Sequence, residues 1–100
     1  MNRVTISTHV LHLGTGAPAR GVEVHLAGPG GRSASGRTDA DGRLRFSEEF
    51  ETGTFTIGFN LEGLSELHLA ATFTVELREG RHHHLPLLVS PYGVSAYRGS

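Results

Sequence analysis

The 100-residue sequence contains no cysteine and no lysine, and its nine basic residues are all arginine. The absence of cysteine excludes disulfides, a thiol nucleophile and zinc ligation by thiolates. The absence of lysine excludes a catalytic amine of the Schiff-base type. Histidine, which occurs seven times, is therefore the side chain best suited to proton transfer near neutral pH.

Long apolar runs and clusters of basic charge are also missing. No apolar stretch approaches the roughly 18 residues that suggest a membrane helix. The formal net charge is -1 and the arginines do not gather in one segment, so the charge pattern of a nucleic-acid binder is absent. The first residues lack the apolar core and small-residue cleavage site of a signal peptide. We therefore predict a cytoplasmic protein with neither a membrane nor a nucleic-acid partner.

Turn-forming residues recur at short intervals and separate brief runs rich in valine, threonine, isoleucine and phenylalanine, which is typical of an all-β protein. The length fits a single domain, residues 1–100. We predict strands at residues 4–11, 22–27, 33–37, 43–46, 54–59, 71–78, 82–89 and 94–98. The segment 60–69 spaces leucines at i, i+3 and i+6, which predicts one or two helical turns, and 39–42 (DADG) predicts a hairpin turn. Short antiparallel strands of this kind predict a β-sandwich.

The alternation of side chains along the strands directs several polar groups away from the core. In the first predicted strand, His9 falls on the face opposite the apolar set. In the seventh, His83 falls with the apolar set, while His82 and His84 take the outward face. In the fourth, Arg43 points outward. Groups suited to acid–base and anion chemistry thus lie outward on three strands, although alternation alone does not show that these strands are neighbours.

Five blocks of the sequence carry a family resemblance. They are residues 7–11 (STHVL), 15–19 (TGAPA), 38–43 (TDADGR), 84–93 (HLPLLVSPYG) and 97–100 (YRGS). In this order they resemble the transthyretin-related 5-hydroxyisourate hydrolases, and the final block is the most specific. The resemblance implies a transthyretin-like (prealbumin-like) β-sandwich of two four-stranded antiparallel sheets with one short helix. It also implies a homotetramer, a dimer of dimers, with active sites in a channel between the dimers.

The resemblance also implies a reaction and a site. The first, fourth, seventh and eighth strands would share one sheet, which would bring His9, Arg43 and His84 onto one face. The implied reaction is hydrolysis of a small molecule, 5-hydroxyisourate, to 2-oxo-4-hydroxy-4-carboxy-5-ureidoimidazoline in urate breakdown, without a cofactor. A neutral His9 or His84 would activate water, and Arg43 would stabilise the oxyanion. The substrate-binding residues implied by the resemblance are Tyr97, Arg98 and Ser100.

Three other interpretations remain open. His9, His82 and His84 together would supply three nitrogens to a zinc ion with an open position for water. A non-catalytic carrier is the second, because vertebrate transthyretin holds thyroid hormone in the same channel. The third is a structural module, since residues 21–26 and 38–43 also resemble carboxypeptidase-regulatory-like sandwich domains. Such a module would explain the first half of the chain but not its C-terminal part.

Overall fold

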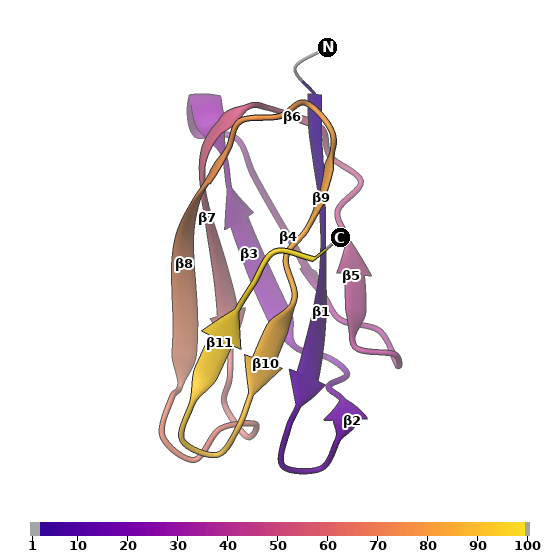
Figure 1. Cartoon of the computed structure of the whole chain (residues 1–100), viewed down its shortest axis with the longest axis vertical. Coiled ribbons are helices and arrows are strands. Elements are labelled where there is room, and N and C mark those ends of the chain that lie inside the picture. The colour runs from indigo at the N-terminus through magenta and orange to yellow at the C-terminus, as the bar shows by residue number, and fades with distance from the viewer. Residues whose placement is uncertain (1–2, 100) are drawn as a thin grey trace.

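The computed structural model describes residues 3–99, which form two β-sheets stacked as two layers (Figure 1). The sheet that contains β1, called the first sheet below, comprises β1 (Arg3–His12), β2 (Ala17–Pro18), β5 (Arg43–Arg45), β6 (Phe50–Glu51), β9 (His82–His84), β10 (Leu87–Val89) and β11 (Val94–Ala96). The second sheet has the order β4 (Ser33–Arg37), β3 (Glu23–Ala27), β7 (Gly53–Asn60) and β8 (Ala70–Leu77), with every pair antiparallel. The predicted all-β sandwich is confirmed.

Strand β1 is the axis of the first sheet. Along one edge it pairs in turn with β6, β5 and β2, all antiparallel. Along the other edge it pairs with β9 and β10, and these pairs are parallel. The predicted wholly antiparallel sheet is therefore wrong at this edge. The reason is topological: the chain crosses the second sheet between β1 and β9, so no hairpin forces the two strands to run in opposite directions.

The predicted strand 82–89 is interrupted where β9 ends and β10 begins. Pro86 has no N–H to contribute to the ladder at this point. The Leu85 N–H still donates to the Ser7 carbonyl, at 2.9 Å, but the Leu85 carbonyl accepts from the Thr8 hydroxyl instead, at 2.6 Å. The fully buried Thr8 side chain therefore closes the gap directly after His84.

We expect Thr8→Val to lower the free energy of unfolding by about 1–3 kcal/mol, because it leaves a buried carbonyl without its donor at nearly constant side-chain volume. Urea unfolding measures this change. Thr56→Val is the matched control, because Thr56 lies on the outward face of β7, and it should change stability by no more than about 0.5 kcal/mol. Equal effects of the two substitutions would contradict the role given to the Thr8 hydroxyl.

The segment 60–69, for which one or two helical turns are predicted, makes one hydrogen-bonded turn but no helix, and in residues 3–99 the only helical element is the short 3-10 turn η1 (Pro29–Gly31). The Leu61 carbonyl accepts from the N–H groups of Leu64 and Ser65, which makes a single turn. Gly63 has a φ of 78°, which a right-handed helix cannot contain. The leucine spacing indicated a helix, but glycine ends it after one turn.

The core lies between the two sheets. Its fully or almost fully buried apolar side chains include Val4, Ile6, Val10, Val24, Leu26, Phe50, Phe55, Ile57, Phe59, Leu61, Leu87 and Val89. The rings of Phe50 and Phe55 meet edge to face with centroids 5.5 Å apart. None of the helical segments in the described residues has the length and apolarity needed to cross a membrane.

Candidate functional site

The outward face of the first sheet carries the histidines and arginines that the sequence analysis singled out. Arg43 lies opposite His9 in the β1–β5 register, and Arg45 lies opposite Ser7. On the other side of β1, Ser7 lies opposite His84. His9 and His84 are therefore diagonal neighbours, with Arg43 directly beside His9. The predicted sharing of one sheet and one face by these three residues is confirmed.

The sheet edge beside His9 is held by the turn of residues 39–42. The sequence predicts a hairpin turn here, and that prediction is wrong. The turn instead carries the chain from β4 in the second sheet to β5 in the first. The Asp39 carboxylate accepts the backbone N–H groups of Asp41 and Arg43, and these bonds, that of Arg43 foremost, lower the pKa of Asp39. The His9 ring donates its Nε2–H to the Asp41 carbonyl at 2.8 Å. His9 and the start of β5 are thus fixed by the same turn.

Glycine is required in this turn. Gly42 has a φ of 74°, a conformation that L side chains rarely adopt, and an added Cβ would lie 2.6 Å from the Val10 carbonyl oxygen. The Val10 N–H donates to the Gly42 carbonyl at 2.8 Å. Close contact with β1 at this point keeps Arg43 in register with His9.

His84 and His82 are held by hydroxyl groups of β1. Its Nδ1 lies 2.8 Å from the Ser7 hydroxyl oxygen, and the same oxygen lies 2.8 Å from His82 Nε2. The remaining nitrogen of His82, Nδ1, lies 2.7 Å from the Thr5 hydroxyl oxygen. These contacts leave Nε2 of His84 as the ring nitrogen directed to other partners. Sequence reasoning missed Ser7 and Thr5, whose only signal was their position in the same outward phase as His9.

Both half-buried rings on β9 favour the neutral form. Desolvation by burial, then electrostatic repulsion from His9 and Arg43, lower the pKa of His84 below its ordinary value. Desolvation, then the charge of Arg45, lower the pKa of His82. Near pH 7 the two imidazoles are therefore uncharged, which is the state that accepts a proton.

The C-terminal tail lies directly against His84. The Gly99 N–H donates to the His84 carbonyl at 2.8 Å, and a Cβ added at Gly99 would lie 2.6 Å from Cδ2 of the ring. The glycine is needed for close approach rather than for a left-handed backbone, because its φ is not positive. A larger residue at position 99 would therefore have to displace the ring or the tail.

We expect Gly99→Ala to move the imidazole NMR signals of His84, because the added methyl group must displace either the ring or the tail. Gly58→Ala makes the same change in the second sheet, where the new Cβ would be 3.3 Å from the Thr72 hydroxyl oxygen, and it should leave the His84 signals in place. Unchanged His84 signals in Gly99→Ala would mean that the tail does not pack on the ring in solution.

The predicted substrate-binding residues are not all brought to this face. Tyr97 is half exposed, and its N–H donates to the Pro86 carbonyl. The Arg98 guanidinium lies 3.6 Å from the Glu79 carboxylate, and both residues line a hollow of about 660 Å³ beside β8. Tyr97 lines the same hollow. Ser100 lies outside the described residues.

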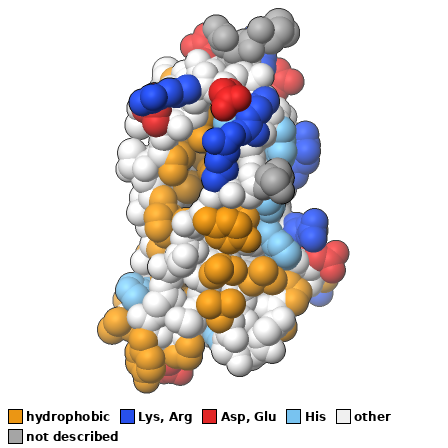
Figure 2. Space-filling view, in the orientation of Figure 1, with side chains coloured by type: hydrophobic (Ala, Val, Ile, Leu, Met, Phe, Trp, Pro, Cys, Tyr) orange, Lys and Arg blue, Asp and Glu red, His pale blue; other side chains and the backbone are white. Residues whose placement is uncertain are grey.

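A space-filling view shows the histidine side chains gathered beside arginines on this face, with apolar side chains below them (Figure 2). The outward phase of β1 and β10 continues into half-buried Leu11 and Leu88, which are partners in the register. The polar side chains of the candidate site and an apolar surface are therefore adjacent on the first sheet.

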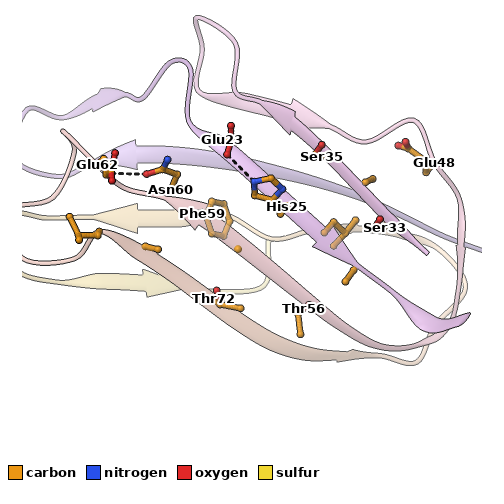
Figure 3. A pocket seen from close by; sticks show the side chains of 16 residues that line it. Glu23, His25, Ser33, Ser35, Glu48, Thr56, Phe59, Asn60, Glu62 and Thr72 are labelled. Atoms are coloured by element: carbon orange, nitrogen blue, oxygen red, sulfur yellow. Dashed lines mark hydrogen bonds and ion pairs between the residues drawn. The ribbon is translucent and has the colours of Figure 1, made fainter. Parts of the chain in front are cut away.

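A hollow of about 910 Å³, larger than the one beside β8, lies on the outer face of the second sheet (Figure 3). It is open and lined mainly by small or polar side chains such as Ser33, Ser35 and Thr72. Its one histidine, His25, is bonded to the Glu23 carboxylate at 2.9 Å. No group there resembles the paired histidines and arginine of the first sheet, so size does not mark the functional site in this chain.

The zinc interpretation has no geometric support in residues 3–99, where no group of three or more His, Cys, Asp or Glu side chains is arranged to hold a metal ion. Both nitrogens of His82 are bonded to hydroxyl groups. The Nε2–H of His9 is directed to the Asp41 carbonyl. The histidine nitrogens are thus arranged for hydrogen bonding rather than for a shared ligand.

Comparisons with known proteins extend over almost the whole chain. Residues 6–99 match the model of the HIUase/Transthyretin family. A 5-hydroxyisourate hydrolase of Caulobacter vibrioides is 38% identical over 112 residues, which cover 95% of this chain and 97% of that protein. The uric acid degradation bifunctional protein TTL of Arabidopsis thaliana is 36% identical over 99% of this chain, which spans 38% of that longer protein.

The solved structures agree with the sequence comparison. The structure of Klebsiella pneumoniae 5-hydroxyisourate hydrolase matches with a TM-score of 0.82 at 35% identity and covers 96% of this chain and 99% of that one. The match therefore includes both sheets and the face that carries His9, Arg43 and His84. On its sequence and its fold, the chain belongs to the HIUase/Transthyretin family.

Proposed function

We propose that this chain is an enzyme that hydrolyses 5-hydroxyisourate, with His9, Arg43 and His84 as its catalytic residues. One observation carries the proposal: two histidines and an arginine meet on one open face of a chain whose relatives are named 5-hydroxyisourate hydrolases. A carrier has no need of a neutral imidazole pair beside a fixed positive charge. A structural spacer would not need a tail packed on a histidine ring.

The reaction adds water across a ring C–N bond. A neutral imidazole, that of His9 or His84, accepts a proton as the water oxygen attacks the carbonyl carbon. The Arg43 guanidinium stabilises the negative charge on the carbonyl oxygen. The C–N bond then breaks, the imidazolium returns its proton to the leaving nitrogen, and the new carboxyl group remains on the product, 2-oxo-4-hydroxy-4-carboxy-5-ureidoimidazoline. No cofactor takes part.

The tail supplies the wall of the site in this proposal. Gly99 lies on the His84 ring, and the half-exposed Tyr97 precedes it in the same tail, where its phenol can bind a polar edge of the flat substrate. Arg98 points toward Glu79 in the single chain, so its part in binding substrate requires release from that ion pair. Roles for Arg98 and Ser100 stay predictions.

We further propose that the chain acts as a homotetramer, a dimer of dimers. Two features support assembly. Strand β8 is an eight-residue edge strand of the second sheet, and an uncovered edge of this length favours pairing with another strand. Leu13 and Tyr92 are exposed at the same end of the first sheet as Leu11 and Leu88. Size-exclusion chromatography with light scattering should give a mass of about four chains, and a monomer would contradict the assembly.

The activity is tested with freshly generated 5-hydroxyisourate, whose decay is followed by ultraviolet absorbance. The wild-type chain should accelerate decay above the spontaneous rate, and a chain that stops before Tyr97 should be impaired. A wild-type chain that leaves the spontaneous rate unchanged would falsify the proposed function. Loss of activity on treatment with a chelator would instead revive the zinc interpretation. The single domain of residues 1–100 and the cytoplasmic location stay predictions.

A further inference from the structure

A continuous network of hydrogen bonds runs between β1 and β9 on the same face as the proposed site. It passes from the Thr5 hydroxyl to His82 Nδ1, from His82 Nε2 to the Ser7 hydroxyl, and from Ser7 to His84 Nδ1, with distances of 2.7, 2.8 and 2.8 Å. The strand register explains the order, because Thr5 lies opposite His82 and Ser7 lies opposite His84. The reaction described above leaves Thr5, Ser7 and His82 without a role.

In this hydrogen-bond network, the direction of each bond determines the direction of the next. The Ser7 hydroxyl has one proton, so it donates to one of the two histidines and accepts from the other. If His84 donates from Nδ1, Ser7 donates to Nε2 of His82, and His82 must then donate from Nδ1 to Thr5. In the opposite setting every bond reverses, and the proton of His84 moves to Nε2. The tautomers of His82 and His84 are therefore coupled through Ser7.

Only the first setting leaves a lone pair on Nε2 of His84. We propose that Ser7 and His82 are positioning residues that hold His84 with its proton on Nδ1, so that Nε2 is the free base of the reaction. This inference rests on the proposed function, because it assigns the base within the same site. His9 is fixed differently, because its Nε2–H is held by the Asp41 carbonyl and its Nδ1 is the unprotonated nitrogen, so the choice between the two rings is left to the experiments below.

The charges around the two rings support the neutral forms that the argument needs. His84 faces His9 on β1 and Arg43 on β5, and both lower its pKa in addition to burial. Desolvation first, then Arg45, His84, His83 and Arg81, lower the pKa of His82. Surroundings of positive charge disfavour an imidazolium at either position, so each ring keeps a single N–H and the coupling holds near pH 7.

Substitutions at Ser7 test whether its hydroxyl orients His84 or only stabilises the fold. Ser7→Ala should lower kcat about 10-fold or more without a comparable change in KM, because the base is present but no longer held in one tautomer. Ser7→Thr keeps the hydroxyl on a strand that accepts β-branched side chains, and it should restore most of kcat. Ser35→Ala is the matched control, made on the outer face of the second sheet (Figure 3), and it should leave kcat unchanged.

Substitutions at His82 test the connection between the rings. Gln places its amide near the position of Nε2 and can still bond to Ser7, whereas Asn reaches only the position of Nδ1 and Thr5. His82→Gln should therefore keep more of kcat than His82→Asn. The combination of Ser7→Ala with His82→Asn should cost little more than either change alone, since the two residues act through one bond. Additive losses would overturn the coupling.

Nitrogen NMR of His84 gives a readout that does not depend on activity. Near pH 7 the wild-type protein should show a protonated Nδ1 and an unprotonated Nε2, and Ser7→Ala should show a mixture of tautomers. A wild-type His84 with its proton on Nε2, or equal spectra for the two proteins, would overturn the inference even if the enzyme is active. Conversely, the protein could fail to hydrolyse 5-hydroxyisourate while the tautomer of His84 changes as expected in Ser7→Ala. The proposed function would then be wrong, and the coupling of the two histidines through Ser7 would be supported.

Discussion

Replacing His84 by asparagine should slow hydrolysis of 5-hydroxyisourate by about 10²–10⁴-fold, the range that a positioned general base contributes. The asparagine amide reaches the position of Nδ1 and can keep the bond to Ser7, but no atom replaces Nε2. The substitution therefore removes the base while preserving the contact that holds β9 to β1. Initial rates across a range of substrate concentrations should show the loss in kcat.

Two comparisons make this result specific. His9→Asn should reduce the rate less than His84→Asn, because His9 then serves to orient water or substrate rather than to accept the proton. His25→Asn changes an exposed histidine on the other sheet and should leave the rate unchanged. If His9→Asn proves the more damaging substitution, His9 is the base and the assignment of His84 is wrong.

Arg43→Gln should lower kcat/KM by about 10²–10³-fold, the usual cost of removing a group that stabilises an oxyanion. A second effect follows from the lowered pKa of His84, to which the charge of Arg43 contributes after burial and His9. In the wild type, His84 stays neutral at pH values somewhat below about 6.5, the ordinary pKa of histidine. The acidic limb of the pH profile should therefore lie below that pH. Without Arg43 the pKa rises, and the limb should move to higher pH.

Arg43→Lys separates the two effects, since it keeps the charge but loses the planar pair of donors. Its acidic limb should stay near that of the wild type while its rate falls. Arg20→Gln, at an exposed position between β2 and β3, serves as the matched control and should alter neither quantity. If the acidic limb has the same midpoint in Arg43→Gln and in the wild type, the pKa of the titrating residue does not depend on the charge of Arg43.

Strand alternation was sufficient to predict much of the site. Because side chains alternate with a period of two, His9, Arg43 and His84 could be assigned to outward faces from the sequence. Their meeting on one sheet came from the family resemblance, because alternation does not say which strands pair. Tyr97 and Arg98 follow the end of β11, where this rule no longer applies, and both line the hollow beside β8. Their grouping at the substrate stays a prediction.

Other features had no clear signal in the sequence. Ser7 and Thr5 are ordinary strand residues, and their bonds to His84 and His82 depend on a parallel register between segments more than 70 residues apart. The break at Pro86 was readable, since proline lacks the N–H that a central strand needs. The false helix in 60–69 arose because leucine spacing was given more weight than Gly63.

The arrangement of β1 has a consequence for how the protein is made. This strand pairs on one side with β9 and β10, which follow every strand of the second sheet in the sequence. The second sheet, from β3 to β8, has all its strands available earlier. We therefore expect that during synthesis the second sheet forms while β1 waits half paired, a slow and exposed stage typical of long-range strand pairing. The histidine face is completed only when β9, which carries His84, has been synthesised.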